Sequence, residues 1–307
     1  MAEMNSLGNP YIAILGPEHS APVRLNLAQA LNSLGGTIAP WVAGAFILTS
    51  TVLNPDQVAQ QSPAAQHAYQ VSIAHTVRMP YIIIAFGLVV LGIAIALTHL
   101  PHITTTQEFR PGKAGDEILK RSIWSYRHTV LGALGIFFYV GVEVGLASIA
   151  VNYFKLQGMD SLKTASFLVS LYWFGALIGR LLGSWILTKI QSGKLLGLFG
   201  FIATALIAVS MFTSGEVAIW TLVLCGFFNS IMFPNIFALG IAGLGPMTSK
   251  GSGLIMTAIV GGAIIPYLLG ALADRVGIQH AFVIPMICYL YIAYYGLSGS
   301  KPRRTVE

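Results

Sequence analysis

Long apolar runs are the feature that most limits what this chain can fold into. A helix of about 20 apolar residues is long enough to cross the hydrocarbon core of a bilayer. Acidic and basic residues make up only 9% of the 307 residues, whereas soluble domains carry roughly 25%. The sequence therefore predicts an all-α integral membrane protein. The apolar runs lie near Leu25–Leu48, Met79–Thr98, Thr129–Phe154, Thr164–Thr188, Leu195–Thr213, Val217–Ile241, Ser252–Leu272 and His280–Ser298.

The net charge of +6 is explained by the loops of such a protein. When loops are assigned alternately to the two sides of the membrane, with residues 101–127 in the cytoplasm, most Lys and Arg residues fall on the cytoplasmic side. This asymmetry satisfies the positive-inside rule, so no nucleic-acid partner is needed to explain it. Cys225 and Cys288 lie in apolar runs, and the histidines lie at loops or span edges. We therefore expect no disulfide framework, no metal site and no cofactor.

One predicted span, RLNLAQALNSLGGTIAP (Arg24–Pro40), carries a polar face. Gln29 and Asn32 are three residues apart, so a helix places them on the same face. Amides inside a bilayer are costly unless they meet a partner or a water-filled cavity. Two interpretations remain open: these amides join neighbouring helices, or they bind a polar solute in a central cavity.

The same span has a counterpart later in the chain, at Lys250–Pro266. The basic residue, the Gly-Gly pair and the proline coincide at a spacing of 226 residues. Many transporters are built from such internal repeats, with the substrate between the halves. The second copy lacks amides at the positions of Gln29 and Asn32, and this difference favours solute binding over packing as their role.

The repeat also predicts a domain organisation. Its unit is six helices, and the unit that begins near Thr129 would have a first copy starting ~100 residues before Met1. We therefore expect the chain to be the C-terminal part of a twelve-helix protein. Residues 1–100 would hold the end of one helix and two spans of the N-terminal bundle, residues 101–127 a cytoplasmic linker, and residues 128–307 a complete C-terminal six-helix bundle and tail. A short interfacial helix is expected within the linker, and a polar external loop with room for one short helix is expected over Thr51–Val77.

Five motifs cover nearly the whole chain. They are NPYIAILGPEHSAPVRLNLAQALNSLGGTIAP, FFYVGVEVGLASIAVNYF (Phe137–Phe154), FGALIGRLLGSWIL (Phe174–Leu187), MFPNIFALGIAGLG (Met232–Gly245) and GSGLIMTAIVGGAIIPYLLGALAD (Gly251–Asp274). In sequence and order these motifs resemble the fucose–galactose–glucose:proton symporter family of the major facilitator superfamily, and within it the bacterial glucose/galactose transporters look most similar.

The resemblance implies a major facilitator fold, with a partial N-terminal and a complete C-terminal six-helix bundle. It also implies uptake of a monosaccharide, coupled to protons or Na⁺, across the inner membrane of a bacterium. Gln29 and Asn32 match the family's sugar-contacting amides, and Phe233 stands where fucose transporters carry a sugar-lining tyrosine. On this resemblance, the family's first-helix acid is expected to lie upstream of Met1, and Asn5 stands at the second position, where the family carries an acid or a glutamine.

Glu143 is the only carboxylate deep within a predicted span. A carboxylate there must pair, protonate or face water, so it is either structural or a ligand for a proton or sugar. Asn229 and Asn152 are weaker candidates for sugar contacts, as are the aromatic residues Tyr172 and Trp173.

Arg180 lies in GRLLGS and resembles the superfamily's short basic motif. We expect it to act on conformation, by pairing with a helix C-terminus or an acid.

The leading hypothesis is a secondary active hexose transporter. The alternatives are a truncated and inactive fragment, a transporter of another monosaccharide such as fucose, an intramembrane enzyme, and a channel or scaffold. An enzyme would need paired acids or a nucleophile with its base within the spans, and Glu143 stands alone there. We therefore expect no enzymatic activity.

Overall fold

The computed structural model describes residue 9 and residues 11–13, 15–46, 58–98, 122–159 and 161–302. Every regular element within these ranges is a helix, and several are interrupted by one-turn segments. The longer helices are α2 (Ala21–Phe46), α4 (Pro63–Leu97), α6 (Arg127–Leu156), α7 (Leu162–Ile186), α8 (Ser192–Phe212), α9 (Gly215–Asn229), α10 (Met232–Ile241), α11 (Thr248–Thr257), α12 (Gly261–Val276) and α14 (Val283–Tyr294). The shorter ones are η1 (Glu18–Ser20), η3 (Ile123–Ser125), η4 (Gly245–Met247), η5 (Ala258–Val260), α13 (Ile278–Ala281) and the π-helix η6 (Tyr295–Gly299).

Seven helical segments of the described chain are long and apolar enough to cross a membrane. They confirm seven of the eight predicted runs, and the protein is a multi-pass membrane protein. The exception is α2, which has 26 residues but is too polar to be included, because Asn26, Gln29 and Asn32 interrupt its apolar sequence. The polar face of α2 therefore distinguishes it from the other long helices.

The chain divides into two compact units, of which one combines Met1–Ile38 with Ile103–Glu307 and the other is Ala39–His102. The second unit contains α4, a helix of 35 residues. At 1.5 Å per residue it is ~50 Å long, more than the ~30 Å of a hydrocarbon core.

The predicted external loop over Thr51–Val77 allowed for one short helix, but its second half is instead the start of the long helix α4, which begins at Pro63. A proline in the first turn and Ser62 as N-cap, accepting a hydrogen bond from the Ala65 N–H at 3.4 Å, start the helix early. Residues 99–121, which include most of the predicted linker and interfacial helix, lie outside the described residues. Of that interfacial segment, Ile123–Ser125 forms the single turn η3.

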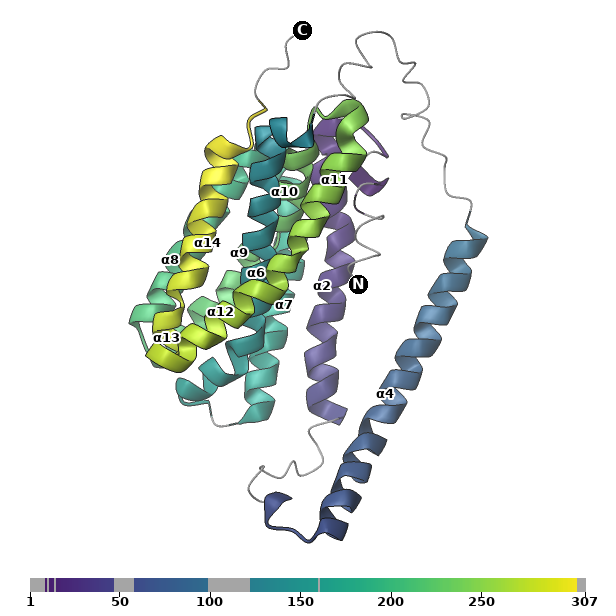
Figure 1. The fold of residues 1–307 in the computed structure, drawn as a ribbon, viewed down its shortest axis with the longest axis vertical. Coiled ribbons are helices and arrows are strands. Elements are labelled where there is room, and N and C mark those ends of the chain that lie inside the picture. Colours follow the sequence, from purple (N-terminus) through teal and green to yellow (C-terminus); the bar gives the residue numbers. More distant parts are fainter. Residues whose placement is uncertain are drawn as a thin grey trace. The chain divides into compact units, whose positions relative to one another are not determined.

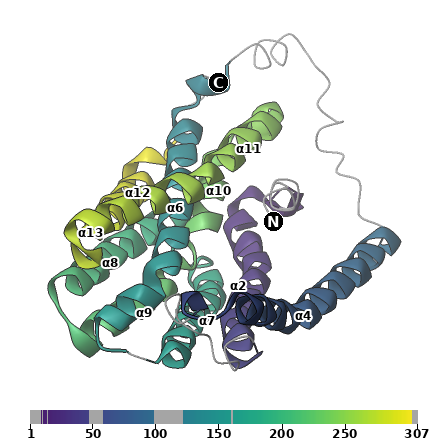
Figure 2. The same ribbon diagram turned by 60° about the horizontal axis from the view of Figure 1, so that its bottom comes forward.

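In the first unit, α6 packs against α7, α10, α11, α12 and α14, while α8 and α9 pack against each other and against α14 and α7, respectively. The helix α12 crosses α6 at close range (Figure 1, Figure 2). Glycine makes this close crossing possible, because a Cβ at Gly261 would overlap the backbone carbonyl of Phe137. The two halves of the sequence repeat differ here. Residues 24–40 belong to one unbroken helix, whereas residues 250–266 are divided between α11 and α12 by the 3₁₀ turn Ala258–Val260.

Replacing Gly261 by alanine is expected to destabilise the protein by about 1–3 kcal/mol, because the added methyl group meets backbone that cannot move independently. Gly270 on the same helix is the control, since a Cβ there has no atom within 4 Å. Thermal unfolding in detergent measures the difference. Equal melting temperatures for Gly261→Ala and Gly270→Ala would contradict the close crossing.

Candidate functional site

The junction between α9 and α10 leaves one backbone carbonyl without a helical partner. Pro234 has no N–H, so the carbonyl of Ser230, four residues earlier, cannot accept the usual helical hydrogen bond. The Nε–H of Arg180 on α7 donates to this carbonyl at 3.0 Å. An arginine from a neighbouring helix therefore supplies the donor that this carbonyl lacks.

The same guanidinium reaches α2. Its Nη1 donates to the backbone carbonyl of Gln29 at 2.7 Å and makes a short contact with the hydroxyl of Ser33. Arg180 is only 2% exposed, so these bonds form in an environment that contains little water. Arg180 thus joins α7 and α2, two helices whose bonded residues are about 150 positions apart in the sequence.

Glu143 on α6 provides the opposite charge. Its Oε1 lies 3.8 Å from Nη2 of Arg180 and accepts a hydrogen bond from the Tyr139 hydroxyl at 2.6 Å. Tyr139 and Glu143 are four residues apart, so they lie one above the other on the same helix face. The acid, the tyrosine and the arginine form one polar cluster on α6 and α7, in which Glu143 retains 17% exposure.

Aromatic rings border this cluster. Phe233 on α10 lies 6.3 Å from the ring of Tyr139 and stacks on Phe237, with the two ring planes 8° apart. Phe233 is 8% exposed. Tyr139 was not among the sequence candidates, although its spacing of four from the lone intramembrane acid was a usable signal.

A second buried polar pair lies between α7 and α9. The Nδ2 of Asn229 donates to the hydroxyl of Tyr172 at 2.6 Å, and the Oδ1 of the same amide has no partner within the described part of the chain. Asn229 is 1% exposed and Tyr172 is 5% exposed. The structure therefore brings these two sequence candidates together in the core of the C-terminal helices.

The two amides of α2 lie in different environments. Gln29 is 8% exposed, and its Nε2 donates to Oδ1 of Asn9 at 3.3 Å, whereas Asn32 is exposed. A third amide, Asn26, donates to Oδ1 of Asn235 on α10 at 3.4 Å. Polar side chains of α2 thus make contacts from its first turns to Ser33. Those of Asn26 and Ser33 are with α10 and α7, respectively.

The weaker sequence candidates are not part of this cluster. Asn152 is exposed near the end of α6. Trp173 packs its ring against Gly36 of α2, where a Cβ would lie 3.0 Å from the ring. Asn5 lies outside the described residues.

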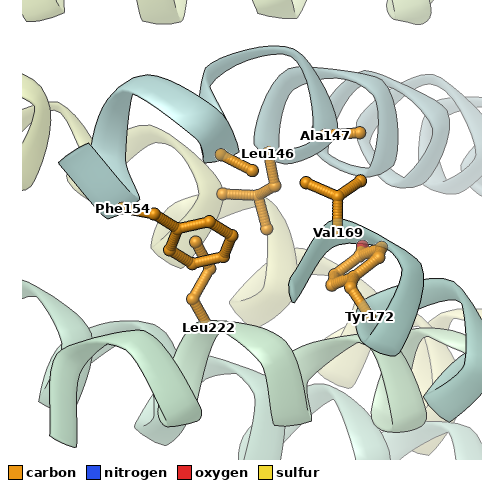
Figure 3. Close-up of a pocket in the computed structure, with 7 residues that line it drawn as sticks. Leu146, Ala147, Phe154, Val169, Tyr172 and Leu222 are labelled. Atoms are coloured by element: carbon orange, nitrogen blue, oxygen red, sulfur yellow. The ribbon is translucent and has the colours of Figure 1, made fainter. Parts of the chain in front are cut away.

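A small pocket lies between α6, α7 and α9, and Figure 3 shows its lining side chains directed toward one another. Apart from Tyr172, whose hydroxyl is bonded to Asn229, the lining side chains are apolar and offer a polyol no hydrogen-bond partner. The polar cluster around Arg180 and Glu143 is therefore the stronger candidate for a functional site. The pocket is lined by Leu146, Ala147, Ala150, Phe154, Val169, Tyr172 and Leu222.

Comparison with known families identifies the fold to which this geometry belongs. The sequence profile of the Major Facilitator Superfamily matches residues 2–259. The chain belongs to the major facilitator superfamily. This membership confirms the predicted fold class and places the protein among transporters rather than enzymes.

Named relatives and a solved structure agree with this assignment. A glucose/galactose transporter of Brucella abortus (strain 9-941) is 44% identical over 95% of this chain and 67% of its own length. An L-fucose-proton symporter of Escherichia coli K12 is 33% identical over 97% of this chain and 69% of its own length. A crystal structure of the major facilitator transporter FucP in the outward conformation superposes with a TM-score of 0.79 at 32% identity, covering 95% of this chain and 72% of that one.

Replacing Tyr172 by phenylalanine is expected to lower the stability of this transporter by about 1–3 kcal/mol, because the buried Asn229 amide loses its hydroxyl partner. Tyr267, which is 75% exposed, is the control for losing a hydroxyl without losing a buried bond. Thermal unfolding in detergent distinguishes them. A Tyr172→Phe variant as stable as Tyr267→Phe would show that the hydrogen bond contributes nothing.

Proposed function

We propose that this protein takes up a hexose of the glucose or galactose type by proton-coupled alternating access. Two observations support the proposal. The relatives named as glucose/galactose transporters and as L-fucose-proton symporters align with nearly all of this chain. The polar cluster also lies where α2 meets α7 and α10, two helices of the other repeat half. In transporters built from repeats, the substrate binds between the halves.

Polar and aromatic side chains on α2, α6, α9 and α10 suit a sugar. Sugars present hydroxyl groups around their edges and apolar C–H faces, which amides and aromatic rings can bind together. We assign the sugar contacts to the amides of Gln29, Asn32 and Asn229 and to the ring of Phe233, with Glu143 as a further hydrogen-bond acceptor. Phenylalanine at position 233 keeps an apolar surface but lacks a hydroxyl, which favours a hexose other than fucose.

We assign the coupling ion to a proton carried by Glu143. A metal cation would need several oxygen ligands around the carboxylate. The neighbours of Glu143 are instead one tyrosine hydroxyl and the guanidinium of Arg180. The positive guanidinium would repel Na⁺. A carboxylate with 17% exposure can still exchange a proton with water. The bacterial relatives support a location in the bacterial inner membrane, where lipid surrounds the spans.

Radiolabelled glucose and galactose uptake into proteoliposomes, with and without an inward proton gradient, tests the proposed function. We expect accumulation of at least one of these hexoses that requires the gradient and saturates with sugar concentration. Fucose in the same assay tests the alternative substrate. Absence of any saturable hexose uptake would contradict the proposal and favour an inactive fragment.

Gln29→Ala and Asn32→Ala are each expected to raise the KM for hexose roughly 3- to 10-fold, the effect of losing one hydrogen bond. Gln70→Ala, which removes an exposed amide from α4, is the matched control and should transport like the unmodified protein. Unchanged kinetics in both α2 variants would mean that these amides serve only to pack helices.

Glu143→Gln preserves the shape of the side chain but removes the proton-binding group. We expect gradient-driven accumulation to fall at least ~10-fold, while sugar exchange between equal concentrations on both sides persists, because exchange requires no net proton movement. Gradient-driven uptake that is unchanged at all pH values would remove Glu143 from the mechanism.

A further inference from the structure

Arg180 uses its hydrogen-bond donors unequally. Nε and Nη1 donate to Ser230 on the α9–α10 junction and to Gln29 and Ser33 on α2. The N–H groups of Nη2 make no hydrogen bond within the described residues, and their nearest acid is Oε1 of Glu143 at 3.8 Å. The neutral acceptors therefore hold the guanidinium in place, while Glu143 supplies the compensating charge.

This charge matters because the guanidinium is almost completely buried, with 2% exposure. A buried cation is strongly disfavoured without a nearby anion. Removing one partner of a buried ion pair therefore destabilises a protein far more than replacing both partners by apolar residues. The titratable groups that face Glu143 are Tyr139 on its own helix and Arg180 and Tyr172 on α7. Among these groups of the described chain, Glu143 is the one whose charge can balance Arg180 at neutral pH, because a tyrosine with an ordinary pKa near 10 is neutral there.

The carbonyls that accept hydrogen bonds from Arg180 differ in whether another donor can replace the arginine. The carbonyl of Ser230 has no helical donor because of Pro234, so it remains dependent on Arg180. The carbonyl of Gln29 lies inside the unbroken helix α2, where the N–H four residues on can bond to it. The contact with α2 is therefore the one that the arginine can give up with little loss in hydrogen bonding.

We propose that Arg180 is the positioning residue that links the proton on Glu143 to the contact between α2 and α7. With Glu143 ionised, the charge of Arg180 is balanced and the guanidinium stays bound to α2. When Glu143 takes up a proton from water, the buried cation loses its counter-charge, the α2 contact opens and water reaches the guanidinium. The only covalent change is the proton transfer, in which a hydronium O–H breaks and the carboxyl O–H of Glu143 forms; the Arg180 hydrogen bonds to α2 are exchanged for hydrogen bonds to water. The inference rests on the proposed function, because it describes how proton binding would move one repeat half relative to the other.

Trp173 provides a reporter for this movement. It lies seven residues before Arg180 on α7, and it packs on Gly36, seven residues after Gln29 on α2. The two contacts are therefore about two turns apart along the same antiparallel helix pair. Opening of the α2–α7 contact should expose the Trp173 ring to an aqueous quencher.

The experiment uses the chain with its other four tryptophans replaced by phenylalanine, reconstituted in detergent micelles. Acrylamide quenching of Trp173 is measured from neutral to acidic pH. We expect the quenching constant to rise at least ~2-fold on acidification, as the closed population is depleted. Glu143→Gln should show the acidic value at every pH, and Arg180→Gln should show no pH response. The tryptophans to be replaced are Trp41, Trp124, Trp185 and Trp220.

Matched variants make the result decisive. Glu216→Gln, which removes an exposed acid from the first turn of α9, should respond like the reference protein. Arg180→Lys keeps the positive charge and should keep a pH response. This variant tests the proposal even if Arg180→Gln does not fold. A normal pH response in Glu143→Gln or in Arg180→Gln would overturn the proposal, as would a response lost in Arg180→Lys.

Adding glucose or galactose to the same samples separates this inference from the proposed function. A pH response of Trp173 without any effect of sugar, together with no hexose uptake, would contradict the transport proposal but support the link between Glu143 and Arg180. Hexose uptake with no pH response of Trp173 would support transport and contradict the link.

Discussion

The hydrogen bond between Arg180 and the carbonyl of Ser230 is the interaction on which the rest of the site depends. Pro234 creates the need for it by removing a backbone N–H within a membrane-spanning segment, where water is scarce. Meeting that need with an arginine introduces a buried positive charge into the bundle. The neighbouring groups of the site then follow from having to balance and hold that charge.

The charge explains why one intramembrane acid and several neutral oxygen acceptors converge on the same point. Glu143 balances the guanidinium, Tyr139 holds the carboxylate, and α2 contributes a carbonyl and a hydroxyl. The same arrangement places a group that can bind a proton beside the contact between α2 and α7. A transporter needs such proximity, because coupling requires that one binding event change the stability of a state used by the other.

The two segments that match at a spacing of 226 residues differ in their structure. The α2 copy keeps its amides and forms one unbroken helix, whereas the later copy has apolar residues at the same positions and is interrupted by η5. In the later copy Ile255 occupies the place of Gln29 and is fully buried in the apolar core. The polar side of the interface is therefore supplied mainly by α2 and by the cluster on α6, α7 and α10.

The sequence by itself determined that the chain crosses a membrane, where most spans lie and which carboxylate is buried, because these properties depend on local composition and on the thickness of a bilayer. It also singled out Gln29, Asn32, Phe233, Asn229 and Arg180 as polar or aromatic exceptions. Only the tertiary structure decided that Gln29 is buried while Asn32 is exposed, that Asn229 meets Tyr172, and that Arg180 bonds to α2. A proline in a span predicts that a carbonyl needs a donor, but the donor can come from any helix that packs nearby. Which helix does so depends on contacts between residues far apart in the chain, and local patterns carry no information about them.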